Sequence, residues 1–545
     1  MIQREQKMTN ERKITSYLCY FAFLFMCVAL VPWAMKFLTY AINVDIAFLT
    51  VSAERMLAGE TMSEAYYDTN PPLSIIVQIP AVLLAKITGT PLYYATSLYV
   101  FILLGLSLLA TNALLKKIDG LSTPQRVIIL SVFLFLNTVK PGYDFGQKDH
   151  ILGMALFPLV LTQILITARV DFNKMLMWCT LLAGSLLILL KPHYGLIPAA
   201  IFLHRIIYQK RISVFKDVDF ITLAGMAIGY IAALFLLFSD FINIILPDIL
   251  KYYTTDISPS VMKIGVILII QAAIPLFLCQ MFLKKAHFLI SVFSVMAVLC
   301  LIPFIMQGKG WAYHAIPATF FLYSCVALLL HHLIVVGLSM IKMDDIKKPA
   351  AFIVVMIAVF GLVYKKTQAM HDFPTHEQYL NSELTQIIND NCTKPCSFFF
   401  FNDMINIAPE LAVYTGQRRA SRFPVMWFMP DLIYAQDMLD KGTPLAHMGE
   451  EELNKAKSKY ITMVLEDLEK HDPSIMIIGH YDYRNDKDNL FDFREFTLQS
   501  DPKFNEFWNQ YTLQKTIDID RIEYMIAKLP GENLIRYDIY VKNAE

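Results

Sequence analysis

Long apolar runs separated by short polar loops fill the chain from residue 14 to residue 364. A helix that crosses a bilayer needs about 20 mostly apolar residues, because the hydrocarbon core is about 30 Å thick. The runs that are long enough, or nearly so, are residues 14–40, 91–115, 127–139, 151–168, 175–190, 195–207, 220–238, 261–283, 288–306, 315–341 and 350–364. The pattern predicts an α-helical polytopic membrane protein with about 11 transmembrane helices.

The sequence changes character at Lys365, where ordinary polar content replaces the apolar runs. Residues 397–401 and 475–478 are strand-like, residues 535–541 are a candidate last strand, and the stretch between Leu432 and Leu468 is helix-like. Two domains are therefore predicted: a transmembrane domain over residues 1–364 and a soluble α/β domain over residues 365–545. The second is large enough for a core of its own.

Composition agrees with a membrane protein, since 56% of the 545 residues are hydrophobic and the mean hydropathy is +0.47. A soluble protein is excluded, because only bilayer-spanning helices need so much uninterrupted apolar sequence. The first apolar run is too long for a removable signal peptide and lacks a small-residue cleavage site, so a retained first helix is expected. The formal net charge is zero, and no nucleic-acid partner is expected.

The placement of charge sets the expected topology, because short loops rich in Lys and Arg stay in the cytoplasm. Such loops hold Lys116, Lys117, Arg126, Arg169, Lys174, Lys210, Arg211, Lys216, Lys284, Lys285, Lys342, Lys347 and Lys348. All of them share a face with the basic N-terminus only if the short apolar run 71–84, which opens with two prolines, does not cross. We therefore predict that residues 71–84 are re-entrant or juxtamembrane, and that the C-terminal domain lies on the face opposite the cytoplasm.

The loops predicted on that opposite face hold the ionisable and aromatic groups. Residues 140–150 combine two carboxylates with lysine, tyrosine and histidine: Lys140, Tyr143, Asp144, Lys148, Asp149 and His150. Gly142 and Gly146 are the expected turn points, and such spacing lets the charged groups converge on one polar ligand. The alternatives are a solvated loop of compensating charges and, for His150, a cap on the next helix.

Asp45 follows the first predicted span and opens an amphipathic stretch over residues 46–57. A carboxylate at a membrane boundary can act as a general base or a metal ligand, and the alternative is an acidic N-cap. Residues 67–72 then lead through Asn70 to a Pro-Pro pair, which fixes an extended entry into the run 71–84.

Two further loops pair a lysine with aromatic and histidine residues. They hold Lys191, His193 and Tyr194 in one case, and Lys309, Trp311, Tyr313 and His314 in the other. Lysine suits a phosphate and aromatic faces suit a sugar ring, whereas the alternative is an aromatic belt with snorkelling lysines.

The C-terminal domain contributes two features of its own. Arg422, with Arg418, Arg419 and Trp427, is predicted either to cover the substrate cleft or simply to lie on the surface. Cys392 and Cys396 are predicted to form a disulfide if the domain faces an oxidising compartment.

The order of these features resembles the GT-C glycosyltransferases, especially the bacterial branch related to protein O-mannosyltransferases and the lipid A aminoarabinose transferase. The residues that carry the resemblance are Asp45, Asn70 with the Pro-Pro pair, and Asp144 or Asp149 in the acidic second loop. Here Ile46 stands where the superfamily usually has a second acidic residue, and Asn70 stands where a basic residue often precedes Pro-Pro.

The resemblance implies a hexosyl- or pentosyltransferase of the bacterial inner membrane, with a cytoplasmic N-terminus and a periplasmic C-terminal domain. It implies inverting transfer from a polyprenyl-phosphate-linked sugar to a hydroxyl of a glycan, lipid or protein, with Asp45 first and Asp149 second as the base. Lys140, Lys148, Lys191 or Lys309 would hold the leaving phosphate. The resemblance leaves open whether Asp45 and Asp149 bind a divalent metal ion.

Two other classes compete with this hypothesis. A transporter or flippase of lipid-linked cell-envelope intermediates would place charges along a path through the bilayer, whereas here they gather at one predicted interface. A sensor or assembly scaffold would not need so many ionisable groups in the loops of one face.

Overall fold

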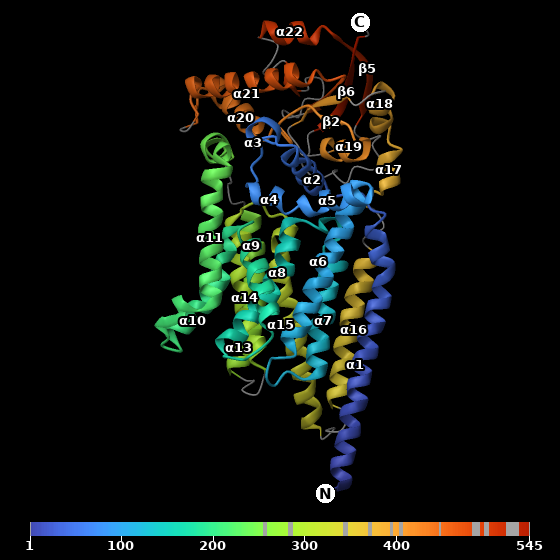
Figure 1. Cartoon of the computed structure of the whole chain (residues 1–545), viewed down its shortest axis with the longest axis vertical. Coiled ribbons are helices and arrows are strands. Elements are labelled where there is room, and N and C mark those ends of the chain that lie inside the picture. The colour runs from blue at the N-terminus through green and yellow to red at the C-terminus, as the bar shows by residue number, and fades with distance from the viewer. Residues whose placement is uncertain are drawn as a thin grey trace. The chain divides into compact units, whose positions relative to one another are not determined.

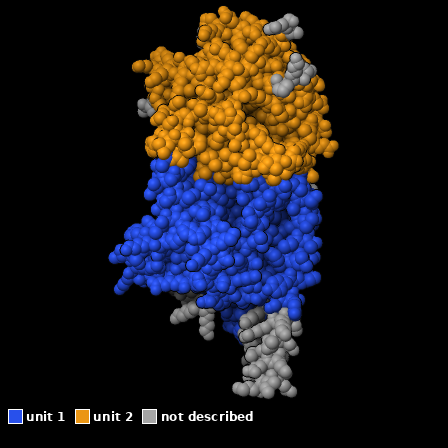
Figure 2. Space-filling view, in the orientation of Figure 1, with its two compact units in different colours: residues 1–38, 97–232, 255–372 blue, residues 39–96, 233–254, 373–545 orange. Residues whose placement is uncertain are grey.

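The computed structural model of the chain describes residues 2–253, 259–281, 287–341, 347–368, 373–392, 396–402, 407–445, 448–481, 491–494, 501–518 and 534–543. The chain divides into two compact units, which Figure 2 colours separately. Unit 1 holds residues 1–38, 97–232 and 255–372, and unit 2 holds residues 39–96, 233–254 and 373–545. Unit 2 thus combines the predicted C-terminal domain with two segments from earlier in the chain. Lys284, Lys285 and Lys342, from the predicted basic loops, lie outside the described residues.

Unit 1 is a bundle of helices. They are α1 (Ile2–Phe37), α6 (Leu92–Leu115), α7 (Thr123–Thr138), α8 (Lys148–Thr167), α9 (Lys174–Ile188), α10 (Leu196–Ile207), α11 (Val218–Leu237), α13 (Pro259–Met281), α14 (Phe288–Met306), α15 (Ile316–Met340) and α16 (Lys347–Gln368). Helix α15 packs against α7, α8 and α14, which run beside it in Figure 1. Each of these helices has a largely buried apolar surface, as expected for the centre of a bundle.

Each of the eleven predicted ranges contains a helix, and seven helices in the described part of the chain are long and apolar enough to cross a membrane. The seven are Ser16–Phe37, Leu92–Leu115, Lys148–Thr167, Val218–Leu237, Phe288–Met306, Ala312–Met340 and Pro349–Lys366. Helices α7 and α9 have 16 and 15 residues, which cover only about 22–24 Å at 1.5 Å per residue. The chain is a helical polytopic protein with fewer full-length spans in these residues than the eleven predicted.

The predicted non-crossing run is broken into two short helices in unit 2. Helix α4 (Pro72–Ile76) begins after Pro71, and α5 (Ile79–Thr88) carries Pro80 in its first turn and ends before Gly89. Helix α5 has 10 residues, about 15 Å of helix, which is half of a hydrocarbon core. Neither α4 nor α5 alone is therefore long enough to cross. Both helices pack instead against α2 (Val44–Leu57).

The sheet of unit 2 explains the strand-like runs of the C-terminal region. Its described strands are β1 (Ser397–Phe401), β2 (Arg418–Arg419), β3 (Ile475–Tyr481), β4 (Phe491–Asp492), β5 (Tyr511–Asp518) and β6 (Leu534–Lys542). The order is β2-β1-β3-β6-β5, with β4 beside β3. Strand β1 is parallel to β2 and β3, whereas β6 is antiparallel to β3 and β5. Every residue of β1 and β3 is buried, which is typical of central strands covered on both faces.

Helices surround this sheet in unit 2. They are α3 (Met62–Ala65), the π-helix η4 (Phe241–Ile245), α12 (Leu246–Tyr252), α17 (His376–Leu380), α18 (Glu383–Asn391), α19 (Ala408–Thr415), α20 (Met429–Asp440), α21 (Glu450–His471) and α22 (Pro502–Trp508). The predicted strands at 397–401, 475–478 and 535–541 and the helices between 432 and 468 are confirmed. A disulfide joins Cys392 to Cys396, between α18 and β1.

Candidate functional site

The acidic loop of unit 1 makes two tight turns before α8. Gly142 and Gly146 have φ of 59° and 89°, a left-handed conformation that glycine adopts without steric cost. Asp149 therefore falls in the first turn of α8, where the helix dipole favours a negative charge. His150 lies in the same turn, and its Nδ1 accepts a hydrogen bond of 3.0 Å from the backbone N–H of Gly146. The histidine thus closes the loop onto the helix.

Asp149 is joined to two other loops of unit 1 through Lys191. The Lys191 Nζ lies 2.7 Å from Asp149 Oδ2 and donates a second 2.7 Å hydrogen bond to Gln307 Oε1. Asp149 has no exposed surface, and 12% of the Lys191 side chain is exposed. Gln307 ends α14 and donates its own amide N–H to the carbonyl of Pro303, which fixes the carboxamide oxygen toward the lysine. Sequence reasoning missed Gln307, although it opens the same motif as Lys309.

The predicted aromatic and histidine residues surround this ion pair. The Tyr194 hydroxyl donates to the backbone carbonyl of His314 at 3.0 Å, and the Tyr313 ring centroid lies 5.8 Å from Lys191 Nζ. Trp311 packs 5.4 Å from His314 between ring centroids. The loop at residues 191–195 and the short 3-10 helix η5 (Ala312–Ala315) are thereby held together.

Three ammonium groups act on this region at once. His314 is within electrostatic reach of Lys148, Lys191 and Lys309, as well as of His193. We call Lys148, Lys191 and Lys309, with Asp149 and Gln307, the Lys191 cluster. The ammonium groups of three lysines thus gather near one buried carboxylate, an arrangement that suits a phosphate.

Polar atoms in and beside the cluster remain without a hydrogen-bond partner among the described residues. They are Asp149 Oδ1, His193 Nε2 and His314 Nδ1, all buried. A buried polar atom without a partner costs about 1–3 kcal/mol. Three such atoms in the loops that meet at Lys191 indicate that a polar ligand or water completes the hydrogen bonding there.

Lys140 and Asp144 form a second charged group in the acidic loop. Burial lowers the pKa of Lys140, the neighbouring Lys366 lowers it further, and Asp144 opposes both effects. Tyr143 lies beside Asp144 in a 3-10 turn, η1 (Gly142–Asp144), and both are partly exposed. Lys140, Tyr143 and Asp144 thus lie in the acidic loop that leads to the Lys191 cluster but are not among the partners in its hydrogen bonds described above.

The protonation of His193 provides a test of this environment. Burial, with the ammonium of Lys191, lowers the pKa of His193 from 6.5 to about 4. The unfolded chain then binds more protons than the folded protein between these values, so we expect stability to fall as the pH falls from about 6.5 to about 4. A His193→Gln variant should show a shallower loss of thermal stability over this window. Identical pH profiles would contradict the buried, neutral imidazole.

Asp45 in unit 2 does not cap its helix. Asn43 is the N-cap of α2, and its side chain accepts a 2.9 Å hydrogen bond from the backbone N–H of Asp45. The alternative interpretation of Asp45 as an acidic N-cap is therefore wrong. The Asp45 carboxylate lies in the first turn and is partly exposed, which suits a group that must reach a substrate.

Asp68 is a second carboxylate that the sequence hypothesis did not select. It is 4% exposed and accepts hydrogen bonds from the backbone N–H and the side-chain amide of Asn70, at 3.1 and 2.5 Å. Asn70, predicted to bind substrate, thus positions Asp68. The hydroxyl of Tyr253 interacts with both Asp68 and Asp45, and with burial they raise the pKa of Tyr253 to about 12. The signal was available, because Asp68 stands two residues before Asn70.

The arginine-rich segment of unit 2 is buried, so the surface alternative is wrong for Arg419, Arg422 and Trp427. Arg422 donates from Nε to Asp467 at 2.8 Å and from Nη2 to Glu466 at 2.8 Å, which already balances its charge. Arg419 is different, because its Nε and Nη1 have no partner among the described residues. Burial and the nearby Arg55 lower the pKa of Arg419 to about 9, while Asp68 opposes the shift.

Metal binding has little support in the described residues, where no group of three or more His, Cys, Asp and Glu side chains is placed to hold an ion. Asp149 already accepts from Lys191, an ammonium that a metal would repel. A divalent ion held by Asp45 and Asp149 stays a prediction.

Comparison with known proteins gives a likeness of fold. No protein-family model and no curated protein matches the sequence. The apo crystal structure of ArnT from Cupriavidus metallidurans matches with 13% identity and a TM-score of 0.47, over 73% of this chain and 84% of that chain. The structure of the same protein bound to undecaprenyl phosphate matches over the same shares, with a TM-score of 0.43. The chemistry of this chain is inferred from its own residues.

Proposed function

We propose that this chain is a membrane glycosyltransferase of the GT-C type, which transfers a sugar from a polyprenyl-phosphate donor to an acceptor hydroxyl on the periplasmic face. The observation that carries the proposal is the Lys191 cluster. It combines three lysines with buried acceptor and imidazole atoms that have no hydrogen-bond partner among the described residues. A phosphate esterified to a lipid and a sugar complements such a site better than a neutral substrate.

The lysines supply the main chemical contribution. When the bond between sugar and phosphate breaks, negative charge develops on the departing polyprenyl phosphate, and ammonium groups already in position stabilise it. A phosphate leaves readily without protonation, so no general acid is required. Asp149 and Gln307 position Lys191 through two hydrogen bonds of 2.7 Å, which reduces the reorganisation needed at the moment of reaction.

Asp45 is the stronger candidate for the base. A carboxylate paired with an ammonium is a poor proton acceptor, and Asp149 is both paired and fully buried. Asp45 is partly exposed and acts together with Asp68 on Tyr253. We assign to Asp45 the removal of the acceptor proton as the anomeric carbon inverts, and to Asp149 the positioning of Lys191. Tyr194, Trp311 and Tyr313 would contact the sugar or the lipid carrier.

The direct test uses purified full-length protein with a radiolabelled undecaprenyl-phosphate pentose or hexose and a panel of glycan, lipid and protein acceptors. We expect label to move to an acceptor and undecaprenyl phosphate to be released. The same protein in liposomes separates the alternative function, because a flippase would move intact donor between leaflets without releasing phosphate. The proposal would be overturned if the donor stayed intact with every acceptor while the protein moved it between the leaflets of the liposome.

A further inference from the structure

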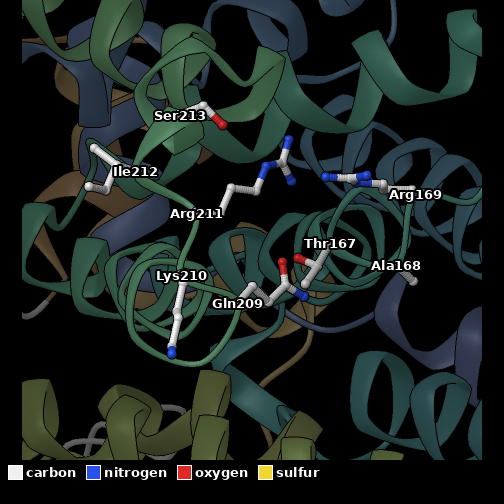
Figure 3. A pocket seen from close by; sticks show the side chains of 8 residues that line it. All are labelled: Thr167, Ala168, Arg169, Gln209, Lys210, Arg211, Ile212 and Ser213. Carbon is white, nitrogen blue, oxygen red and sulfur yellow. The ribbon is translucent and has the colours of Figure 1, made fainter.

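A basic pocket of about 520 Å³ lies elsewhere in unit 1, where α8 and α10 end. Its lining is Thr167, Ala168, Arg169, Gln209, Lys210, Arg211, Ile212 and Ser213 (Figure 3). Three of these side chains are cationic and none is acidic. Figure 3 shows the guanidinium groups of Arg169 and Arg211 pointing toward one another. Facing cations repel, so an anion between them would be bound favourably.

A buried ion network lies next to this pocket and is joined to two of its lining residues, Thr167 and Arg211. Arg205 has no exposed surface and pairs with Asp219 at 2.8 Å and with Asp217 at 3.0 Å. Its Nε also donates to the hydroxyl of Thr167 at 2.8 Å. These bonds tie the end of α8 to α10 and to the start of α11, so the walls of the pocket are fixed in place.

The positive and negative charges of the buried network cancel, whereas the pocket keeps positive charge that no carboxylate among the described residues balances. Arg211 Nη2 lies 2.6 Å from Asp217, so Arg205 and Arg211 balance Asp217 and Asp219. Arg169 and Lys210 are then in excess, and within the described ranges neither makes an ion pair with a protein group. Arg211 Nη1 is buried and has no hydrogen-bond partner there, so one donor of the network remains available to a ligand.

The two cations in excess, Arg169 and Lys210, stand at backbone positions that are unfavourable for residues other than glycine. Arg169 and Lys210 have φ of 55° and 50°, the left-handed conformation in which glycine would be without strain. The chain nevertheless carries its long cationic side chains at these positions. Strain of this kind commonly marks a functional site.

Apolar side chains next to the pocket indicate what kind of anion enters. Ile212 is 75% exposed and Tyr208 is 77% exposed, and Ile207 beside them is 56% exposed. In a polytopic protein such a surface contacts acyl chains. Basic pockets at the cytoplasmic ends of helices bind anionic headgroups, and the sequence predicts both of these loops on the cytoplasmic face.

We propose that this pocket binds the phosphate of an anionic membrane lipid, with Arg169, Lys210 and Arg211 as ligands and with the exposed apolar residues against the acyl chains. The site is separate from the Lys191 cluster in its residues and is independent of the proposed transfer reaction. A soluble phosphate would satisfy the same cations but would make no use of Ile212 and Tyr208.

The test measures how much phosphatidylglycerol the full-length protein retains by native mass spectrometry. The protein is taken from nanodiscs of phosphatidylcholine that contain a minority of phosphatidylglycerol. The informative variant is Arg169→Gly with Lys210→Gly, since glycine suits both backbone positions and the variant should fold. We expect retained phosphatidylglycerol to fall about tenfold. The matched control, Lys116→Gln with Lys117→Gln, removes two exposed charges from another loop and should retain the lipid.

Two results would overturn the proposal. One is undiminished lipid retention in the glycine variant, because the cations would then serve only the helix C-termini. The other is an equal loss of lipid in the Lys116→Gln with Lys117→Gln control, which would mean that retention follows the total charge of the protein and not this pocket.

Discussion

An Asp45→Asn variant is expected to transfer sugar about 10²–10⁴-fold more slowly than the wild-type protein, the usual contribution of a general base. The amide keeps the shape of the side chain but cannot accept the proton of the acceptor hydroxyl. The backbone N–H of residue 45 still reaches the Asn43 cap, so helix α2 should keep its stability. Initial transfer rates with labelled donor, beside a thermal melt of each protein, measure both expectations.

The matched control for this experiment is Glu54→Gln in the same helix. It replaces another partly buried carboxylate by an amide and should leave transfer within about twofold of wild type, because that side chain has no proposed chemical role. Unchanged transfer in Asp45→Asn would remove Asp45 from the mechanism. In that case Asp68→Asn becomes the decisive variant, since Asp68 interacts with the same tyrosine.

Replacing Lys191 by methionine is expected to affect both stability and activity. The change leaves the carboxylate of Asp149 fully buried without its ammonium, and breaking a buried pair in this way costs about 3–5 kcal/mol. It also removes the central cation of the proposed phosphate site. We expect a lower melting temperature in detergent and loss of donor binding, measured by retention of labelled undecaprenyl-phosphate sugar.

A double variant separates the two effects. Lys191→Met with Asp149→Asn removes both charges, so most of the lost stability should return because no unpaired charge stays buried. Donor binding and transfer should stay lost, since the phosphate still lacks its cation. Recovery of transfer in the double variant would show that Lys191 serves only to neutralise Asp149.

Sequence motifs contained most residues of the candidate site, but they did not show which of these residues pair with one another. Lys191, Asp149, Tyr313 and His314 were selected because they stand at the ends of apolar runs. Gln307 was not selected, because the selection followed charged and aromatic residues and its amide is neutral. Its Oε1 nevertheless accepts a 2.7 Å hydrogen bond from Lys191. Asp68 was passed over for the neighbouring Asn70, whose amide proves to position it. Lys191 stands 42 residues from Asp149 and 116 residues from Gln307 in the sequence, so these partners meet only through helix packing.

The sequence by itself determined the elements of the fold. Uninterrupted apolar runs must become helices in a bilayer, because no water is present to satisfy the backbone. The buried strands β1 and β3 were equally visible, since their apolar runs are short and rich in aromatic or β-branched residues. The ends of α7 and α9 were less visible in the sequence; a Lys-Pro pair follows each of them, Lys140-Pro141 and Lys191-Pro192.

Only the tertiary structure decided which segments form one body and which charges balance. Residues 39–96 and 233–254 join the C-terminal sheet rather than the helical bundle, although nothing local to them encodes that association. Burial likewise left Arg422 in ion pairs and two donor atoms of Arg419 without a hydrogen-bond partner among the described residues, although the two arginines stand three residues apart. The physical reason is that solvent exclusion and ion pairing depend on contacts between distant segments, which a linear pattern of apolar and polar residues does not contain.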